Sequence, residues 1–422
     1  MTKTIFLIAG EASGDALGAK LMKALKECHP ERSEGSPAAG DPSPVAQDDS
    51  EIKFLGVGGE RMAAEGLASI FPMEELSLLG FVEIVPHIPK LLKRIEQVAE
   101  EILRAKPDIV VTIDAPAFNH RVARKLRDMA ESREQRAEST PHHPASIIHH
   151  PLLVHYVAPT VWAYKPERAA KIAKLYNHLL VILPFEPPYF EKEGLPTTFV
   201  GHPILEEDVA DGDGTAFRAA QGIPADVPLL GIMPGSRSGE LKRLLPVFRE
   251  TTALLKRELP NLRAVMFATA RFAERLKAET AGWPIPVTVI AGREGRKDAL
   301  AACNVALAKS GTGTLEFALA RVPMAVAYKV NPLSAWMLRR MIQVQHVNLI
   351  NLVLGKSAIP ELLQEECTPL RLAQSLIPLF RNDDARLAQT LAMHTALGKL
   401  RGDPALSPSR KAAQTLLALM AG

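Results

Sequence analysis

The sequence has few cysteines, no excess of charge of one sign and no long apolar run. Its three cysteines, Cys28, Cys303 and Cys367, are far apart and lack histidines at metal-ligand spacing, which argues against a disulfide framework or a zinc site. The 50 basic and 47 acidic residues leave a net charge of only +3, so we expect no nucleic-acid partner. No run approaches ~18 apolar residues and no leader precedes the first strand. We therefore expect a cytosolic protein without a spanning helix.

Apolar runs of strand length alternate with segments of helical period along most of the 422 residues. Residues 4–10 precede a helical segment at 15–27, and residues 108–114 precede another at 121–131. Between them, Leu91, Ile95, Val98 and Ile102 share one helical stripe that begins near Pro89. Near-continuous apolar strands alternating with helices are typical of parallel sheets that are covered on both faces.

The alternation stops in a polar stretch after residue 205 and then begins again. This pattern predicts an α/β protein with two Rossmann-like, doubly wound parallel-sheet domains and a helical C-terminal tail. The expected bounds are 1–205, 206–385 and 386–422, with the tail packing back on the first domain. Because ligands in such sheets bind beyond the carboxyl ends of the strands, two facing domains suggest a cleft.

Two segments do not follow the alternation. Residues 29–51 and 131–151 are rich in Pro, Ser, Ala and charge, which indicates exposed loops or disordered insertions. The second contains four histidines, at 142, 143, 149 and 150, and an Asp-Gly-Asp at 211–213 resembles a metal-binding acid pair. Neither has the other ligands or the preceding strand that a metal site needs, so we expect no metal and no cofactor.

The first strand is followed by the turn Gly-Glu-Ala-Ser-Gly-Asp at residues 10–15. Ser13 and Gly14 at the start of a helix offer backbone N–H groups to a phosphate or a sugar hydroxyl. Glu11 would repel a pyrophosphate, which favours a neutral or singly phosphorylated sugar. The alternative is simple strand-to-helix packing with Ser13 or Asp15 as N-cap. The turn lacks G-x-G-x-x-G, which argues against a hydride-transfer enzyme.

Two turns in the second half could hold a nucleotide. Gly235, Ser236 and Arg237 follow a strand and combine backbone donors with a guanidinium, as a diphosphate site requires, without the ending of a nucleotide-hydrolase loop. A later turn, with Ser310, Gly311 and Thr312, precedes a helix that contains Glu316. That carboxylate could accept both hydroxyls of a ribose or could cap the helix.

Asp114 ends the strongly apolar strand at 109–113 and is followed by Ala115 and Pro116. It should lie at the carboxyl edge of the first sheet, where a partly desolvated carboxylate can take a proton from an attacking hydroxyl. The alternative is that Asp114 only caps its loop.

Motifs in the same order along nearly the whole chain resemble those of the bacterial lipid-A-disaccharide synthases, a family of inverting glycosyltransferases. They are AGEASGD near the start, GVGGERM at 56–62, LGFVEIVPHIPKLLKR at 79–94, IDAPAFN at 113–119, HYVAPTVWAY at 155–164, PFEPPYFEKEG at 184–194, VGHP at 200–203, PGSR at 234–237, SGTGTLE at 310–316, VNLINLVLG at 347–355 and PELLQEECTP at 360–369.

The resemblance implies two Rossmann-like domains in the GT-B arrangement, with acceptor mainly in the first and UDP-sugar mainly in the second. The implied reaction joins UDP-2,3-diacylglucosamine to 2,3-diacylglucosamine 1-phosphate, giving a β-1,6-linked disaccharide phosphate and UDP. The motifs carry over Glu11 and Asp114 as catalytic acids, with Asp114 as general base. The implied donor-site contacts are Arg237 to diphosphate, Glu316 to ribose, and the polar residues Asn348 and Asn351.

A mixed apolar and basic segment precedes and enters the helical stretch that begins near Pro89. It combines four apolar residues, Leu78, Leu79, Phe81 and Val82, with three basic ones, Lys90, Lys93 and Arg94. Such a combination is expected where a protein rests on anionic lipid, the alternative being core packing beside a solvated basic face. With lipid substrates we expect a peripheral protein on the cytoplasmic face of the inner membrane. The sequence leaves a homo-oligomer open.

Two other functions compete with the transferase. A UDP-sugar epimerase on the same two-domain plan would need the turns of the second domain but not the lipid-facing segment. A sugar-phosphate binding protein with a hinge would bind ligand without turnover and would tolerate an amide at position 114.

Overall fold

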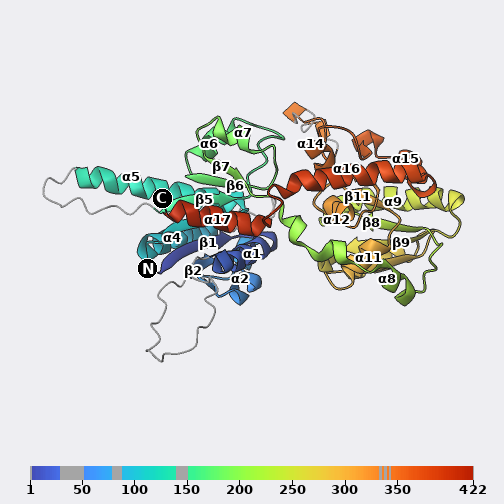
Figure 1. The fold of residues 1–422 in the computed structure, drawn as a ribbon, viewed down its shortest axis with the longest axis horizontal. Coiled ribbons are helices and arrows are strands. Elements are labelled where there is room, and N and C mark those ends of the chain that lie inside the picture. Colours follow the sequence, from blue (N-terminus) through green and yellow to red (C-terminus); the bar gives the residue numbers. More distant parts are fainter. Residues whose placement is uncertain are drawn as a thin grey trace, which may run out of the picture. The chain divides into compact units, whose positions relative to one another are not determined.

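The computed structural model describes residues 2–28, 52–77, 88–138, 151–331, 335–336, 340–341 and 344–421. These form two compact units, Met1–Pro203 together with Gly402–Gly422, and Ile204–Arg401 (Figure 1). The insertion expected at 29–51 and the four histidines at 142–150 lie outside the described residues, as do Leu78, Leu79, Phe81 and Val82.

The first unit contains a seven-stranded parallel sheet in the order β3-β2-β1-β4-β5-β6-β7. The strand order reverses between β1 and β4, which pair with Ala9 opposite Ile113. This is the switch point at which such sheets bind ligands. The strands are β1 Lys3–Ala9, β2 Ile52–Val57, β3 Ala68–Ser69, β4 Ile109–Ile113, β5 Leu152–Tyr156, β6 His178–Val181 and β7 Thr197–Phe199.

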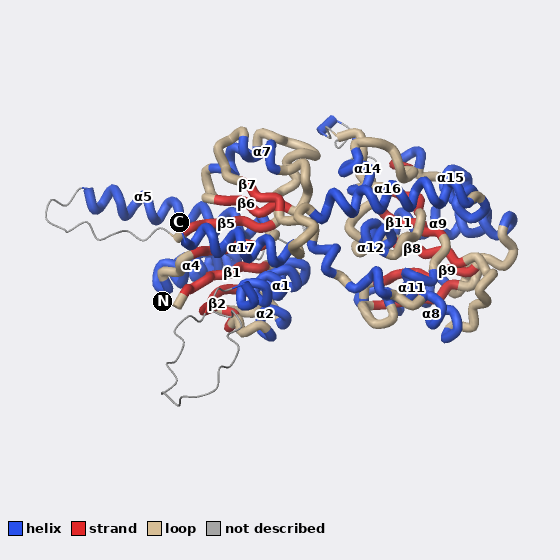
Figure 2. The backbone as a smooth tube through the Cα atoms, viewed as in Figure 1, coloured by secondary structure: helices blue, strands red, loops and turns tan. Residues whose placement is uncertain are grey.

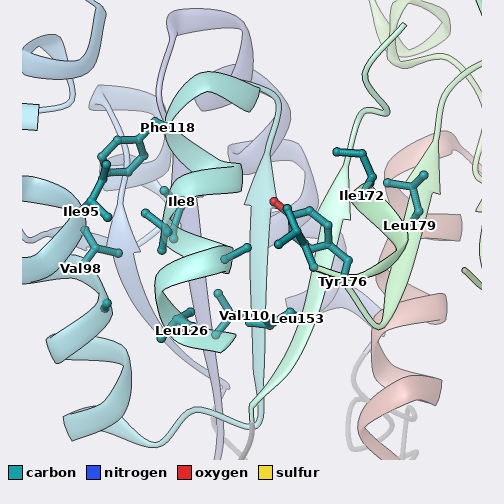
Figure 3. Close-up of a cluster of buried hydrophobic side chains, with 14 of the residues drawn as sticks. Ile8, Ile95, Val98, Val110, Phe118, Leu126, Leu153, Ile172, Tyr176 and Leu179 are labelled. Atoms are coloured by element: carbon teal, nitrogen blue, oxygen red, sulfur yellow. The ribbon is translucent and has the colours of Figure 1, made fainter. Parts of the chain in front are cut away.

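Helices cover both faces of this sheet because alternate strand residues point to opposite sides. Ile8 and Val110 pack with α4 and α5, where Ile95, Val98 and Phe118 are buried (Figure 3). Ile5 and Leu7 pack with α1 and α17 on the other face. The helices are α1 Ala12–Cys28, α2 Glu60–Ala64, α3 Glu74–Ser77, α4 Ile88–Ala105, α5 Pro116–Glu138, α6 Arg168–Ala173, α7 Pro187–Glu191 and α17 Pro408–Ala421.

The sequence predicts α4 well and the end of α5 poorly. Leu91, Ile95, Val98 and Ile102 are all buried on one side of α4, as expected. The prediction of an irregular segment from residue 131 onward is wrong for residues 131–138, because these residues continue α5 to Glu138. This stretch is rich in Glu, Arg and Ala, which propagate a helix without an apolar stripe.

The second unit contains a six-stranded parallel sheet in the order β10-β9-β8-β11-β12-β13. Its order reverses between β8 and β11, so it has a switch point of its own. The strands are β8 Leu229–Met233, β9 Arg263–Ala268, β10 Val287–Ala291, β11 Val305–Lys309, β12 Met324–Tyr328 and β13 Glu361–Leu363. The strand β13 was not expected, because three residues are too few for a clear pattern.

Helices also cover the second sheet, which Figure 2 shows as strands enclosed by helices. They are α8 Gly214–Ala220, α9 Ser238–Glu258, α10 Ala273–Thr280, α11 Arg296–Ala302, α12 Gly313–Leu319, α14 Leu349–Leu354, α15 Pro369–Arg381 and α16 Asp383–Arg401. The fold class expected from sequence is confirmed. The expected tail, 386–422, is divided between the units, since α16 packs on α12, α14 and α15, whereas α17 packs on α1. Among the described helices, none has the length and apolar composition to cross a membrane.

The docking of α17 generates a prediction. Leu416 is fully buried against the first sheet, so Leu416→Ala should lower the free energy of unfolding of the first unit by roughly 2–5 kcal/mol. Leu387 on α16 is 57% exposed, and Leu387→Ala is the matched control, with an expected change within about 0.5 kcal/mol. Urea unfolding measures both. Equal stability of the two variants would contradict the docking.

Candidate active site

The carboxyl edge of the first sheet brings together the residues after β1 and β4. The Ser13 hydroxyl lies close enough to the Asp114 carboxylate to favour its ionised form, although the two residues are a hundred positions apart. Gly10 permits this approach, because a Cβ at position 10 would lie 2.7 Å from the Cβ of Ala115. Ser13 and Asp114 therefore meet at the switch point.

Asp114 is half-buried and held by its backbone. Its N–H donates to the Tyr156 carbonyl at 2.9 Å, and the Asn119 side chain donates to its carbonyl at 2.7 Å. Asp114 and Ala115 have φ values of 49° and 43°, which are strained for residues with a Cβ and are often found at functional sites.

Burial raises the pKa of the Asp114 carboxyl above its ordinary value of 3.8. Hydrogen bonds from the Ala115 N–H and the Ser13 hydroxyl oppose this rise because they favour the ionised form. A raised pKa and a position at the edge suit a general base.

The other residues of the opening turn have different environments. Glu11 is exposed, and its carbonyl accepts the Asp15 N–H at 2.9 Å. Gly14 is buried within close packing distance of Ala9 and the Ile113 carbonyl. Asp15 does not cap its own helix. Its buried carboxylate accepts N–H bonds from Gly59, Arg61 and Met62 at 2.8–3.1 Å, which tethers the 56–62 motif to the first turn.

In the second unit, the turn after β8 already holds a carboxylate. Glu240 accepts the backbone N–H groups of Ser236 and Arg237 at 2.9 and 3.2 Å and pairs with Lys309 at 3.0 Å. Gly235, with a φ of 114°, allows this closure, since a Cβ there would lie 2.4 Å from a Glu240 carboxylate oxygen. The guanidinium of Arg237 is 79% exposed. The expected backbone donors are thus engaged internally, whereas the Arg237 side chain faces solvent.

Sequence reasoning missed Glu240 and Lys309. Burial alone would raise the pKa of Glu240, but Lys309, the Ser236 N–H and Arg237 hold it below its usual value. The Arg237–Glu240 spacing, N-cap to third helical residue, is the one local signal for this carboxylate. Lys309 carried no such signal, because it reaches Glu240 only through the pairing of β8 with β11.

Glu316 forms an ion pair instead of capping α12. Its carboxylate lies 2.7 Å from the Arg296 Nε, and both side chains are about one-fifth exposed. The Arg296 guanidinium also lies over the Phe267 ring, 5.1 Å from its centroid. Arg296 therefore fixes the orientation of Glu316.

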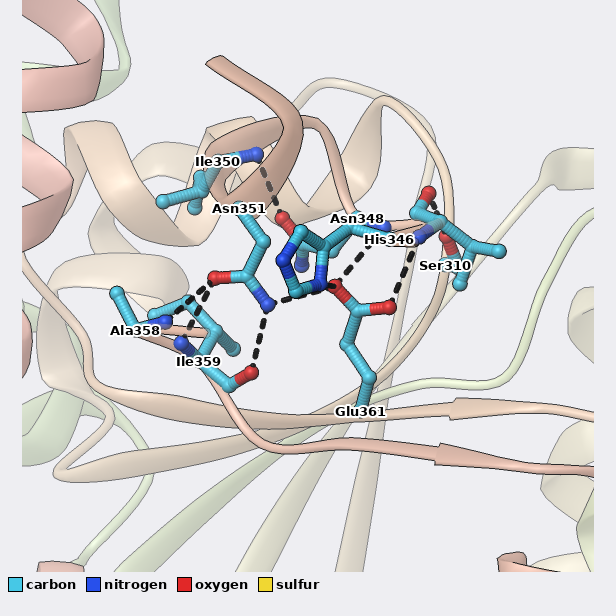
Figure 4. Close-up of polar contacts among 9 residues, drawn as sticks. Ser310, His346, Asn348, Ile350, Asn351, Ala358, Ile359 and Glu361 are labelled. Carbon is cyan, nitrogen blue, oxygen red and sulfur yellow. Dashed lines mark hydrogen bonds and ion pairs between the residues drawn. The ribbon is translucent and has the colours of Figure 1, made fainter. Parts of the chain in front are cut away.

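Ser310, Asn348 and Asn351 meet in one buried polar cluster (Figure 4). Asn351 donates to the Ile359 carbonyl and to Glu361 and accepts the N–H groups of Ala358 and Ile359, all at 2.6–2.9 Å. An amide side chain makes at most about four hydrogen bonds, so no capacity is left for a ligand. Asn351 thus closes the loop around α14.

Glu361 organises the rest of this cluster. Its carboxylate accepts the N–H groups of Val347 and Asn348 at 2.9 and 3.3 Å, besides the Asn351 amide. Ser310 donates to the Val347 carbonyl at 2.8 Å. The Asn348 side chain caps α14 through Ile350, and its Nδ2 is buried without a hydrogen-bond partner. Gly311 and Thr312 follow Ser310 and lead into α12.

Comparison with known proteins decides the family. Residues 5–414 match the family model of lipid-A-disaccharide synthetase. The chain is 44% identical over 413 residues to the lipid-A-disaccharide synthase of Rhodospirillum centenum, covering 98% of this chain and 94% of that protein. It is 41% identical to the synthase of Paramagnetospirillum magneticum, covering 98% and 96%.

The chain belongs to the lipid-A-disaccharide synthase family. This confirms the resemblance noted in the motifs.

Solved structures of low sequence identity share the fold. A glycosyltransferase from Rickettsia africae superposes with a TM-score of 0.57 at 13% identity, covering 99% of this chain and 98% of that one. A UDP-GlcNAc 2-epimerase from Neisseria meningitidis also gives 0.57, at 10% identity, covering 99% and 100%. At such identities the likeness shows the fold alone, so synthases and epimerases share one architecture.

Two of the three basic residues expected at a lipid surface are paired within the synthase chain. Arg94 binds Glu75 through two nitrogens at 2.8 and 3.1 Å and stacks over Phe71, and Lys90 lies 3.4 Å from the same carboxylate. Lys93 is exposed, as is the neighbouring Leu92. The four apolar residues of that prediction fall outside the described residues.

The acid pair at 211–213 has a structural role. Asp213 caps α8 through the Ala216 N–H at 2.9 Å, and its own N–H donates to Asp298 at 2.8 Å. Within the described part of the chain, no group of three or more His, Cys, Asp or Glu side chains is arranged to hold a metal ion. Cys303 and Cys367 are buried free thiols, as expected, and Cys28 is half-buried.

The saturated Asn351 amide generates a stability prediction. Asn351→Ala leaves the buried N–H groups of Ala358 and Ile359 without acceptors, so unfolding of the second unit should require about 2–4 kcal/mol less free energy. Arg237→Ala, at an exposed position, should change it by less than about 0.5 kcal/mol. Chemical unfolding compares the two. An Asn351→Ala protein as stable as the parent would show that its amide is not a structural clamp.

Proposed function

We propose that the chain transfers the sugar of UDP-2,3-diacylglucosamine to 2,3-diacylglucosamine 1-phosphate, forming a β-1,6-linked disaccharide 1-phosphate and UDP. The observation that carries this proposal is membership of the synthase family over nearly the full length, residues 5–414. The chain is accordingly a UDP-sugar-dependent glycosyltransferase of lipid A biosynthesis. The epimerase alternative loses its support, because the full-length relatives are synthases.

Asp114 acts as general base in this proposal. As the C6 hydroxyl of the acceptor attacks the anomeric carbon of the donor, its proton moves to the Asp114 carboxylate. The bond from that carbon to the UDP oxygen breaks, and UDP leaves with the electron pair, so the configuration inverts. Two features support this role, the edge position of the carboxylate and its raised pKa. Glu11, exposed beside Ser13, supplies a second acid near the acceptor.

The second unit holds the donor. Arg237 is the main contact to the diphosphate, because its guanidinium is exposed and can offset the charge that develops on UDP. Glu316, oriented by Arg296, accepts the ribose hydroxyls. Ser236, Ser310, Gly311 and Thr312 shape this site, and Asn351 supports it without touching the ligand. The Neisseria epimerase that shares the fold was solved with UDP-GlcNAc bound.

Both substrates carry acyl chains, so the enzyme works at a membrane surface. We place it peripherally on the anionic cytoplasmic face of the inner membrane, with the segment 78–94 toward the lipid. Exposed Leu92 and Lys93 support this orientation, since an apolar side chain can enter the interface while a lysine binds headgroups.

The purified protein tests the function directly. Incubated with both diacylated sugars, it should yield the disaccharide phosphate and UDP by mass analysis. Asp114→Asn should bind UDP normally but lose roughly two to four decades of turnover, the usual contribution of a positioned base. Near-normal turnover would remove Asp114 from the mechanism, and isomerised UDP-sugar without disaccharide would identify an epimerase.

A further inference from the structure

A stripe of basic side chains runs along α5 from the neighbourhood of Asp114. His120, Arg124 and Arg127 are spaced four and three residues apart, so they share one face of the helix. His120 Nδ1 lies 2.9 Å from the Tyr176 hydroxyl, and Arg127 donates to the Leu175 carbonyl at 3.1 Å. This face of α5 therefore lies against the segment after α6, where Figure 3 shows Tyr176 beside the sheet.

Arg168 adds a second guanidinium from the first residue of α6. It stacks on Tyr164, 5.9 Å from the ring centroid, and reaches the hydroxyl of that residue at 3.5 Å. Arg168 and Arg124 both act on His120, whose pKa is lowered to about 4 by burial and then by these two charges. His120 is thus a neutral side chain flanked by two cations at ordinary pH.

Neither guanidinium is neutralised. Within the described residues, no carboxylate lies at ion-pair distance from Arg124 or Arg168, whereas Arg94, Arg237 and Arg296 each have a glutamate partner. His120 Nε2 is buried and has no hydrogen-bond partner either. Two unpaired cations and an unused imidazole nitrogen in one place indicate an anionic ligand.

The loop from β5 to Arg168 at the start of α6 is held in place by its backbone conformation and by a buried hydrogen bond. Val157 and Lys165 have φ values of 77° and 59°, which are strained for residues with a Cβ. The Trp162 indole donates to Glu186 at 3.1 Å, and Glu186 also accepts the Leu183 N–H at 3.0 Å. Such strain persists only where surrounding contacts hold the loop in one conformation. The backbone that leads to Arg168 is therefore held in one conformation before any ligand binds.

We infer that Arg168 and Arg124, with His120 between them, bind the phosphate monoester of the acceptor. The assignment rests on the proposed function, in which the acceptor alone carries such a group. Asp114 and Glu11 would repel that phosphate, so it must lie away from them and near cations. Since α5 begins at Pro116, His120 and Arg124 lie about 6 and 12 Å further along its axis. An acceptor can thus place its C6 hydroxyl at Asp114 and its phosphate toward this stripe.

Steady-state kinetics with two acceptors tests this assignment. The probes are 2,3-diacylglucosamine 1-phosphate and the same sugar without phosphate, each with UDP-2,3-diacylglucosamine. Arg168→Gln and Arg124→Gln should each raise the KM for the phosphorylated acceptor roughly 10- to 100-fold, as loss of a charged hydrogen bond does. The KM for the donor should stay unchanged, and the variants should match the parent on the acceptor that lacks phosphate. Arg168→Lys, which keeps the charge, should restore part of the loss.

Lys125→Gln is the matched control, a basic residue on another face of α5 where it pairs with Glu96 at 3.2 Å, and should leave both KM values unchanged. An unchanged KM for the phosphorylated acceptor in both variants would overturn the assignment. An equal rise on the two acceptors would overturn it as well, because the cations would then act on lipid headgroups or on the fold. If the parent protein forms no disaccharide at all, the proposed function fails instead.

Discussion

The close approach of the Ser13 and Asp114 loops is the constraint on which the candidate site of the first unit depends. It joins the loops after β1 and β4, the two neighbouring strands at which the strand order reverses. Parallel strands end at one edge, so this is where side chains from distant parts of the sequence can meet. Asp114 is held there in a strained backbone conformation. The apolar strands, the absence of a side chain at Gly10 and the hydrogen bond from the Asn119 amide all contribute.

The second unit has a switch point of the same kind, but there a lysine is paired with a glutamate. At its switch point, Lys309 at the end of β11 binds Glu240, which also occupies the N–H groups after β8. Glu316 and Glu361 are likewise held by internal donors. The Arg237 side chain contacts this network at Glu240, 3.3 Å away, but is 79% exposed, and it is the group we assign to the diphosphate. In the proposed mechanism, one unit offers an acid for the chemistry and the other offers a cation for the leaving group.

The sequence predicts the features that local patterns control. Strands buried on both faces appear as continuous apolar runs. Residues that end such strands must lie at the sheet edge, and this rule predicts the position of Asp114. Partners distant in sequence were not predictable. Asp15 was considered only as an alternative N-cap of its own helix, but its carboxylate binds N–H groups at the start of α2. Lys309 reaches Glu240 only because β8 and β11 are neighbours. Residues 131–138 carry no apolar period, so their helix could not be recognised from periodicity.

The central claim is that Asp114, held by Ser13, is the base. The most direct test is the pH dependence of kcat/KM for the acceptor in the parent protein and in Ser13→Ala. Activity should fall as the pH drops through the pKa of Asp114, which burial raises above 3.8. Without the Ser13 hydroxyl the ionised form is less favoured, so this acidic limb should move to higher pH. The acceptor phosphate titrates alike in both proteins. An acidic limb at the same pH in both would contradict the account.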